Sequence, residues 1–378
     1  MPWKEYTAMQ TKEQFIREAK IGILSFSSLC AKYKISRQTG YKWLNRERLL
    51  GPAGLIELSR RPKRSPKQTT AEVEAEVLRI RSEHTDWGGR KIRKIIEREG
   101  KFTIPAASTV TAILRRNGKL DKEQCEKRGA ITRYEYEKPN QLWHMDFKGN
   151  FLLLDATLCY PLTIIDDHSR FLVGLKACPD EKALTVQKHL SEIFKKYGMP
   201  ERILIDNGAP WGDDEDSPYT FLTTWMMELG IAIAHCRPYH PQTNGKNERF
   251  NLTLQNEVIT KQGFENLEEV QARFDEWGEM YNTYRPHDAL GLEVPASRYK
   301  PSSQRFPEGL PVPDYGSTAI VRRTDQRGKI FFEGHRLRLG KAFPKKRVEI
   351  RPTTTEGVIE VYYFNFKIAH FDLRNRKC

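Results

Sequence analysis

The sequence predicts a multidomain protein with three kinds of fold: α-helical helix-turn-helix domains, then a mixed α/β core, then a small C-terminal β-barrel. Helical periodicity dominates the first third, strands alternate with helices in the middle, and short strands separated by glycines fill the end. The formal charge changes at the same places. It is +14 over residues 1–138, −8 over 139–300 and +8 over 301–378.

Composition narrows the class of protein. A hydrophobic content of 38% and an aromatic content of 11% support folded cores. No run of 18 apolar residues occurs and the N-terminus lacks an apolar signal region, so we expect a cytoplasmic protein, associated with the nucleoid when bound to DNA. The six cysteines are scattered singly, which indicates neither a zinc knuckle nor a disulfide framework.

The uneven charge points to a polyanionic partner. Basic flanks suit DNA, because each neutralised phosphate releases condensed counterions. An acidic centre would repel DNA unless a metal ion intervened. The alternative is that the domains merely differ in charge.

Residues 1–50 predict a helix-turn-helix domain: a helix, a short second helix, a tight turn, and a polar third helix with Ser36 as its N-cap. A plain helical bundle with a solvated face is the alternative. The expected core residues are Leu29, Ile35, Trp43 and Leu44. The predicted DNA-binding side chains are Arg37, Gln38, Thr39, Tyr41 and Lys42.

Residues 51–69 predict a basic linker that is extended by prolines and follows phosphates or a minor groove. Its expected DNA contacts are Arg60, Arg61, Lys63, Arg64 and Lys67. Residues 70–118 predict a second helix-turn-helix domain, a weaker pattern than the first, and residues 119–138 a polar linker. In the second domain the expected DNA contacts are Ser108 and Thr109, either of which could cap the last helix, and Arg115 and Arg116 at its end.

Residues 139–299 predict the core. Three β-rich runs, "LWHMDFKGNFLLL", "YPLTIIDDHS" and "FLVGLKACP", precede alternating helices and strands, which indicates a mixed sheet covered by helices. A long helix near 181–198 is expected to bury Leu184, Leu190, Ile193 and Phe194. A proline-rich linker is expected over 300–314 and the β-barrel over 315–378.

Three acidic residues occupy positions that a surface charge does not need. Asp146 lies inside a strand, Asp206 ends the strand "RILID" before an "NG" turn, and Glu248 lies in the first turn of a helix. Convergent carboxylates of this kind suit hard divalent cations. Spacing alone leaves open three unrelated acids with local partners. Other acids compete with them: Asp155, Asp166, Asp167 and the cluster at 213–216.

Four motifs in order, "WHMDFKG", "TIIDDHSRFLVG", "ILIDNGAPW" and "HPQTNGKNERF", resemble the integrase-core, or DDE, transposases of bacterial insertion sequences, relatives of retroviral integrases. The front end, "SRQTGYKWLNRERLLGPAGLIELSRRPKRSP", is similar to the tandem helix-turn-helix region of one branch of this family. The similarity covers nearly the whole chain.

The resemblance implies an RNase H-like core whose metal ligands and catalytic residues are Asp146, Asp206 and Glu248, with two Mg²⁺ (or Mn²⁺) ions per active site. His240, Gln242 and Asn244 would contact DNA or only shape their loop, and Lys246 and Arg249 would supply cations. Trp211 would pack in the core or stack on a base. Two departures are visible: Gln255 replaces a basic residue of many relatives, and the zinc module of retroviral integrases is missing.

The implied function is a transposase that binds the terminal inverted repeats of its element, cleaves the 3′ end and transfers it to target DNA. Its partners would be double-stranded DNA and a second copy of itself, in a dimer or larger oligomer. Three alternatives remain: a domesticated or inactive DNA-binding regulator, an RNase H-like nuclease acting on RNA–DNA hybrids, and a retroviral-type integrase, which the missing zinc module disfavours.

Overall fold

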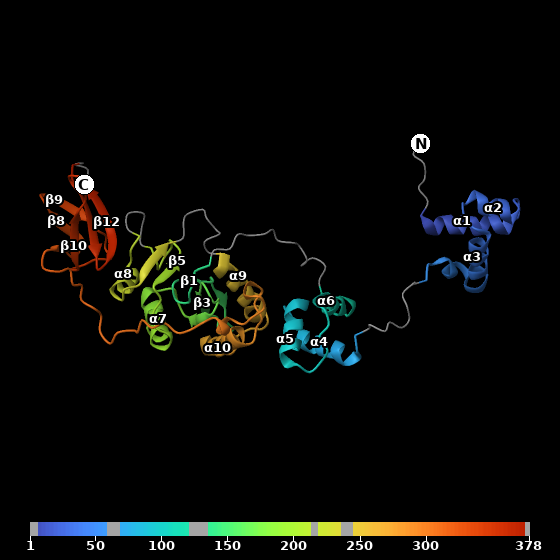
Figure 1. The fold of residues 1–378 in the computed structure, drawn as a ribbon, viewed down its shortest axis with the longest axis horizontal. Coiled ribbons are helices and arrows are strands. Elements are labelled where there is room, and N and C mark those ends of the chain that lie inside the picture. The colour runs from blue at the N-terminus through green and yellow to red at the C-terminus, as the bar shows by residue number, and fades with distance from the viewer. Residues whose placement is uncertain (1–6, 59–68, 121–134, 213–217, 236–244, 375–378) are drawn as a thin grey trace. The chain divides into compact units, whose positions relative to one another are not determined.

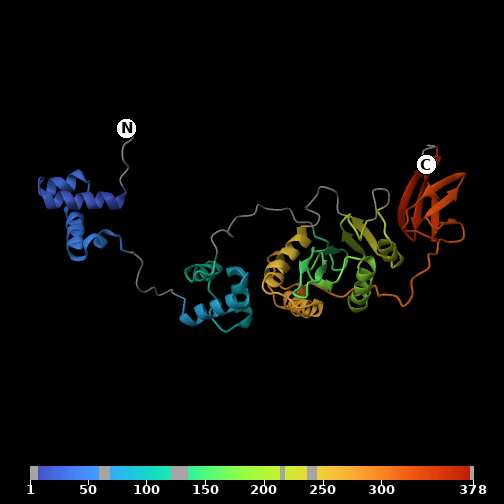
Figure 2. The same ribbon diagram turned by 180° about the vertical axis from the view of Figure 1, so that it is seen from behind.

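The computed structural model describes residues 7–58, 69–120, 135–212, 218–235 and 245–374. The chain divides into two compact units, residues 1–68 and 69–378. Figures 1 and 2 show their helices and strands from opposite sides. No helix in the described part of the chain is both long and apolar enough to span a membrane.

The first unit is the predicted helix-turn-helix domain. It contains α1 (Ala8–Ile21), α2 (Phe26–Lys32), α3 (Arg37–Leu50) and the short 3₁₀ helix η1 (Gly51–Leu55). Ser36 caps α3 as predicted, since its hydroxyl accepts a hydrogen bond from the Thr39 backbone. Leu29 and Trp43 are buried, and Ile35 and Leu44 pack against them, so the predicted core is confirmed.

The second unit begins with three more helices: α4 (Ala71–Glu83), α5 (Gly89–Glu99) and α6 (Ala107–Arg116). Their core contains Trp87 and isoleucines from α5 and α6. The predicted cap of α6 is wrong. Ala106 holds the N-cap position without a side-chain hydrogen bond, and Ser108 and Thr109 lie inside the first turn.

The core contains a mixed sheet with the order β2-β3-β1-β5-β6, and β4 also pairs with β3. Strands β1 and β4 each pair antiparallel with β3. Strand β5 runs parallel to β1, and β6 runs parallel to β5. This strand order and direction are those of an RNase H-like core. The strands are β1 (Trp143–Phe147), β2 (Phe151–Leu152), β3 (Leu158–Asp166), β4 (Leu172–Cys178), β5 (Arg202–Ile205) and β6 (Ala232–His235).

Helices cover both faces of this sheet. One face packs on α7 (Ala183–Tyr197) and α8 (Phe221–Glu228), and the other on α9 (Gly245–Leu254), the π-helical turn η4 (Gln255–Ile259) and α10 (Leu267–Thr283). Trp143 and Met145 of β1 belong to the first core. Because side chains alternate along a strand, His144 and Asp146 point to the α9 side.

One sequence expectation about the core is wrong. Leu184 is 79% exposed, and Val186 takes its place on the buried face of α7. The expected linker over 300–314 begins on the core: the Ser302 backbone N–H donates to the Tyr197 carbonyl, and Phe306 packs against the first core cluster.

The C-terminal part is not the closed barrel that the sequence predicts. Its strands form a four-stranded sheet in the order β12-β11-β10-β7 and a separate two-stranded ribbon, β8-β9, and no pairing among the described residues closes them into a barrel. The strands are β7 (Ile320–Arg323), β8 (Lys329–Phe332), β9 (His335–Arg338), β10 (Arg347–Pro352), β11 (Val358–Tyr363) and β12 (Phe366–Asp372). Gly328 and Gly340 meet so closely that a Cβ on Gly328 would lie 1.8 Å from the Gly340 oxygen.

Candidate active site

The carboxyl ends of two parallel strands bring Asp146 and Asp206 to one edge of the sheet. In the β1–β5 pair, His144 lies opposite Leu204, so Asp146 lies near the end of β1 and Asp206 directly follows β5. Functional groups gather at such strand ends in open α/β sheets. The chain turns directly after Asp206, as the "NG" dipeptide predicts, and the Gly208 backbone N–H donates to Asp206 Oδ1 at 3.1 Å.

Asp146 carries the electrostatic signature of a paired acid. Its pKa is raised to about 6, chiefly by burial and secondly by the nearby charge of Asp206. Asn251 Nδ2 of α9 donates to Asp146 Oδ2 at 3.2 Å. Repulsion between two carboxylates and partial burial are conditions that a bound cation relieves, so these two side chains fit a divalent metal.

Glu248 is not joined to this pair. Within the described residues, no three His, Cys, Asp or Glu side chains lie close enough together to hold a metal ion. Glu248 is exposed in the first turn of α9, three residues before Asn251. Side chains three residues apart share a helix face. The face that carries Glu248 is therefore the one from which Asn251 reaches Asp146.

Sequence reasoning missed Asn251. Its position three residues after Glu248 was the available signal, because helical spacing places both on one face. The competing acids Asp166 and Asp167 are buried and hydrogen-bonded within the core. Asp155 caps its own turn, with its Oδ1 accepting from the Thr157 backbone at 2.8 Å.

The predicted DNA contacts divide into three groups. Arg37, Gln38, Tyr41 and Lys42 are exposed on α3, as are Ser108 and Arg115 on α6 and Arg249 on α9, while Thr39 and Thr109 are half-buried. Arg116 pairs with Glu74, and Lys246 pairs with Asp167, so their charges are engaged within the protein. The remaining contacts lie outside the described residues: Arg60, Arg61, Lys63, Arg64, Lys67, His240 and Asn244.

Trp211 packs in the core. It is 1% exposed and stacks on Phe147, with ring centroids 5.8 Å apart. Of the two roles that the sequence allowed, the structure places it in the packing role. The acidic cluster at 213–216 lies outside the described residues.

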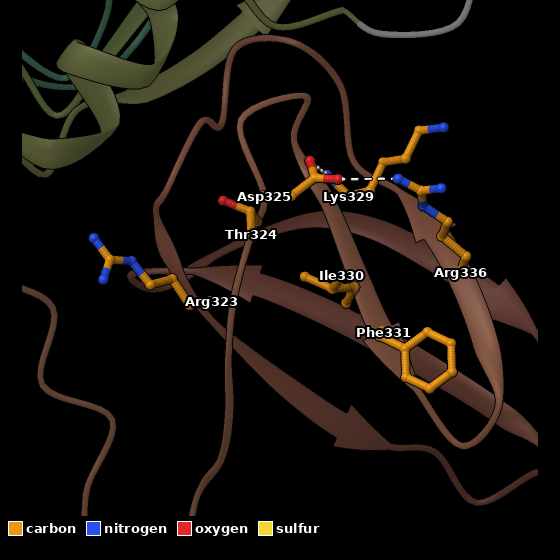
Figure 3. Close-up of a pocket in the computed structure, with 7 residues that line it drawn as sticks. All are labelled: Arg323, Thr324, Asp325, Lys329, Ile330, Phe331 and Arg336. Atoms are coloured by element: carbon orange, nitrogen blue, oxygen red, sulfur yellow. Dashed lines mark hydrogen bonds and ion pairs between the residues drawn. The ribbon is translucent and has the colours of Figure 1, made fainter.

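A basic hollow of about 280 Å³ lies on the C-terminal module, away from the predicted metal ligands in sequence. Asp325 lies in it and pairs with Arg336, with 3.3 Å between Oδ2 and the guanidinium nitrogen, as the dashed line in Figure 3 marks. The exposed ring of Phe331 is another part of the lining. A carboxylate in the hollow opposes a phosphate there, so we assign no ligand to it. The lining residues are Arg323, Thr324, Asp325, Lys329, Ile330, Phe331 and Arg336.

Family models match three stretches of the chain, residues 11–114, 136–295 and 319–378. Residues 136–241 and 229–295 match two families described as "Integrase core domain". Residues 11–63 match a "Helix-turn-helix domain" and 39–114 a "Homeodomain-like domain". The N-terminal part of the chain is therefore similar to helix-turn-helix domains, and the middle part is similar to integrase cores. Residues 319–378 match the "IS481 family transposase, C-terminal domain".

Individual relatives are distant. The chain is 23% identical over 235 residues to the "Insertion element IS407 uncharacterized 31.7 kDa protein" of Burkholderia multivorans, covering 61% of this chain and 82% of that one. It is 24% identical over 200 residues to the "Putative transposase for insertion sequence element IS5376" of Geobacillus stearothermophilus, covering 50% of this chain and 49% of that one.

Similar solved structures come from retroviruses. A chain of the simian T-cell lymphotropic virus intasome in complex with the PP2A regulatory subunit B56 gamma has a TM-score of 0.37 and 16% identity, covering 77% of this chain and 97% of that one. The HTLV-2 integrase catalytic core domain in complex with magnesium has a TM-score of 0.33 and 14% identity, covering 43% of this chain and 97% of that one.

Proposed function

We propose that the chain is a DNA transposase that binds the terminal inverted repeats of its insertion sequence, cleaves the 3′ ends and transfers them to target DNA. The observation that carries the proposal is the pairing of Asp146 with Asp206 at the carboxyl edge of the sheet. A buried acid beside a second acid is unfavourable in an apo protein, and it persists where a function needs it.

In this proposal Asp146, Asp206 and Glu248 hold divalent Mg²⁺ or Mn²⁺, two ions per site. When bound, such ions lower the pKa of a water or hydroxyl nucleophile and neutralise charge on the phosphate that is attacked. Glu248 joins the two aspartates through a change of side-chain rotamer on binding metal and DNA. Asn251 holds the Asp146 carboxylate in one orientation through its amide N–H.

The helix-turn-helix domains would supply affinity for the repeat. The exposed side chains of α3 are of the types that reach base edges and phosphates, and the basic linker adds non-specific attraction. Both ends of an element must be processed together, so we propose that the working form is a dimer or a larger oligomer on DNA. The similarity to the putative transposase of Geobacillus stearothermophilus supports this partner class.

Substitution of the three acids tests the proposal. Asp146→Asn, Asp206→Asn and Glu248→Gln should each reduce cleavage of a terminal-repeat oligonucleotide in Mg²⁺ or Mn²⁺ below detection, while DNA affinity stays close to that of the wild type. The DNA flanking the gene supplies the repeat sequence for this assay. Strand transfer retained by any one of the three variants would remove that residue from the proposed site.

The second candidate is a DNA-binding regulator with an inactive core. It is favoured by one observation: Glu248 does not join the two aspartates within the described residues. A wild-type protein that binds the repeat specifically but never nicks it, in either metal, would establish this candidate instead.

A further inference from the structure

We propose that Asp167 is a positioning residue that fixes the strand carrying Asp146 and the helix carrying Glu248 relative to each other. The inference rests on the proposed function, because it assigns Asp167 a role in the geometry of that metal site. Sequence reasoning treated Asp167 as a competing acid and Lys246 as a DNA contact. The structure pairs them with each other.

The contacts of Asp167 come from three segments. His144 Nε2 of β1 donates to Asp167 Oδ1 at 2.7 Å, and Lys246 Nζ of α9 donates to the same oxygen at 2.5 Å. The other oxygen, Oδ2, accepts from the Tyr136 backbone N–H at 2.8 Å. The Asp167 side chain is 4% exposed and that of His144 is 3% exposed, so both lie within the core.

Both side-chain donors lie two residues before a predicted metal ligand. His144 precedes Asp146 on the same face of β1, since side chains two apart on a strand point the same way. Lys246 lies in the same helical turn as Glu248, so an anchor at Lys246 fixes the height and rotation of that turn. One carboxylate thus connects the two elements that must deliver ligands to a common ion.

The far end of the same helical segment has its own anchor. Glu257 of η4 accepts from Arg285 Nε at 3.0 Å and from Trp277 Nε1 at 3.2 Å. Asn251 contacts Asp146 between the two anchors. The helix is therefore held at both ends, and the Asp167 anchor and the Asn251 hydrogen bond both connect it to β1.

A buried ion pair contributes little to the free energy of unfolding, but it can fix how two elements are aligned with each other. Removing two charges from water has a large desolvation penalty, and apolar residues of similar volume often stabilise as well. Here the ion pair holds β1 and α9, which carry the predicted metal ligands, in one alignment. Partners of metal ligands typically change metal affinity by about 10- to 100-fold when they are removed.

The test measures Mn²⁺ binding by the full-length protein without DNA, by electron paramagnetic resonance titration. The variants are Asp167→Asn, Lys246→Met and Lys246→Arg. Glu276→Gln is the control, because Glu276 forms an exposed ion pair with Arg273 on α10. Asp146→Asn reports whether the proposed metal site exists. Repeat-DNA affinity is measured in parallel.

We expect Asp167→Asn and Lys246→Met to weaken Mn²⁺ binding by about 10-fold, with DNA affinity unchanged. Lys246→Arg should restore most of the metal affinity, and Glu276→Gln should leave it intact. A purely structural role would lower the melting temperature without this selective loss of metal affinity.

Unchanged Mn²⁺ affinity in folded Lys246→Met overturns the proposal, as does a loss of DNA affinity alone. Lys246 is the more exposed partner, with 20% of its side chain accessible, so this variant decides the question if Asp167→Asn fails to fold. Equal Mn²⁺ binding by wild type and Asp146→Asn would instead refute the metal site, and the proposed function with it.

Discussion

Asp146 is the residue whose surroundings say most about the site. It is partly buried on the α9 face of β1, beside Asp206, with an amide from Asn251 as its hydrogen-bond donor. The sequence identified it as an acid inside a strand. Helical spacing places Asn251 on the same face as Glu248, but its contact with Asp146 depends on how α9 crosses β1, which the sequence does not show.

Asp146→Asn should stabilise the metal-free protein at pH 8 and have almost no effect at pH 4. The folded-state pKa is raised to about 6, above the unfolded value, so ionisation is less favourable in the folded state. The destabilisation therefore appears as pH rises from about 4 to about 6 and reaches roughly 2–3 kcal/mol above that window. Urea denaturation in EDTA at both pH values measures it.

Glu276→Gln is the control for this experiment, because its carboxylate is largely exposed on α10. It should show no comparable gain at pH 8. If Asp146→Asn and wild type unfold at the same urea concentration at pH 8, Asp146 does not experience the repulsion and burial described above.

At the scale of elements, the segment from α9 to α10 depends on one buried ion pair. Arg285 and Glu257 have side-chain exposures of 7% and 9%. The sequence pattern predicts helices through this segment, but it does not identify the Arg285–Glu257 pair. Nothing in a helical pattern distinguishes an acid that anchors a π-helical turn from one on a solvated face.

Arg285→Ala should destabilise the protein by about 3–5 kcal/mol, because it leaves the Glu257 carboxylate buried without its cation. Arg273→Ala removes the partner of Glu276 in an exposed ion pair on α10. This substitution should change the free energy of unfolding by about 1 kcal/mol or less. Guanidinium denaturation of both variants gives the comparison. Equal effects of the two substitutions would show that burial of the Arg285 pair has no special weight.

Element type was predictable wherever the hydrophobic period was long or the cap was local. Ser36 and the helices of the first unit follow from such local signals. The prediction that Leu184 is buried was wrong because apolar character alone does not decide which face of a helix packs on a sheet. The prediction of a closed C-terminal barrel was wrong. Alternating apolar and polar residues predict strands, but closure of a barrel depends on long-range pairing, here of β7 with β8 and β9.

At the scale of the whole molecule, the charge division assigns DNA binding to the N-terminal part. Residues 1–138 carry a formal charge of +14 and residues 139–300 carry −8. A fragment of residues 1–138 should bind the terminal repeat by itself. Its affinity should fall by roughly 10³-fold or more between about 50 and about 200 mM salt, because phosphate contacts release counterions.

Fluorescence anisotropy with labelled repeat DNA measures this salt dependence, with residues 139–378 as the comparison. Repeat binding that requires the acidic core, or that is insensitive to salt, would contradict the division of roles by charge.

The proposal that Asp146, Asp206 and Glu248 share a divalent cation is tested most directly by a crystal structure of the full-length protein with Mn²⁺. The predicted result is an anomalous peak between the carboxylates of the two aspartates, with Glu248 turned toward it. A peak elsewhere, or Mn²⁺ bound by the aspartates while Glu248 remains in solvent even with repeat DNA present, would contradict it.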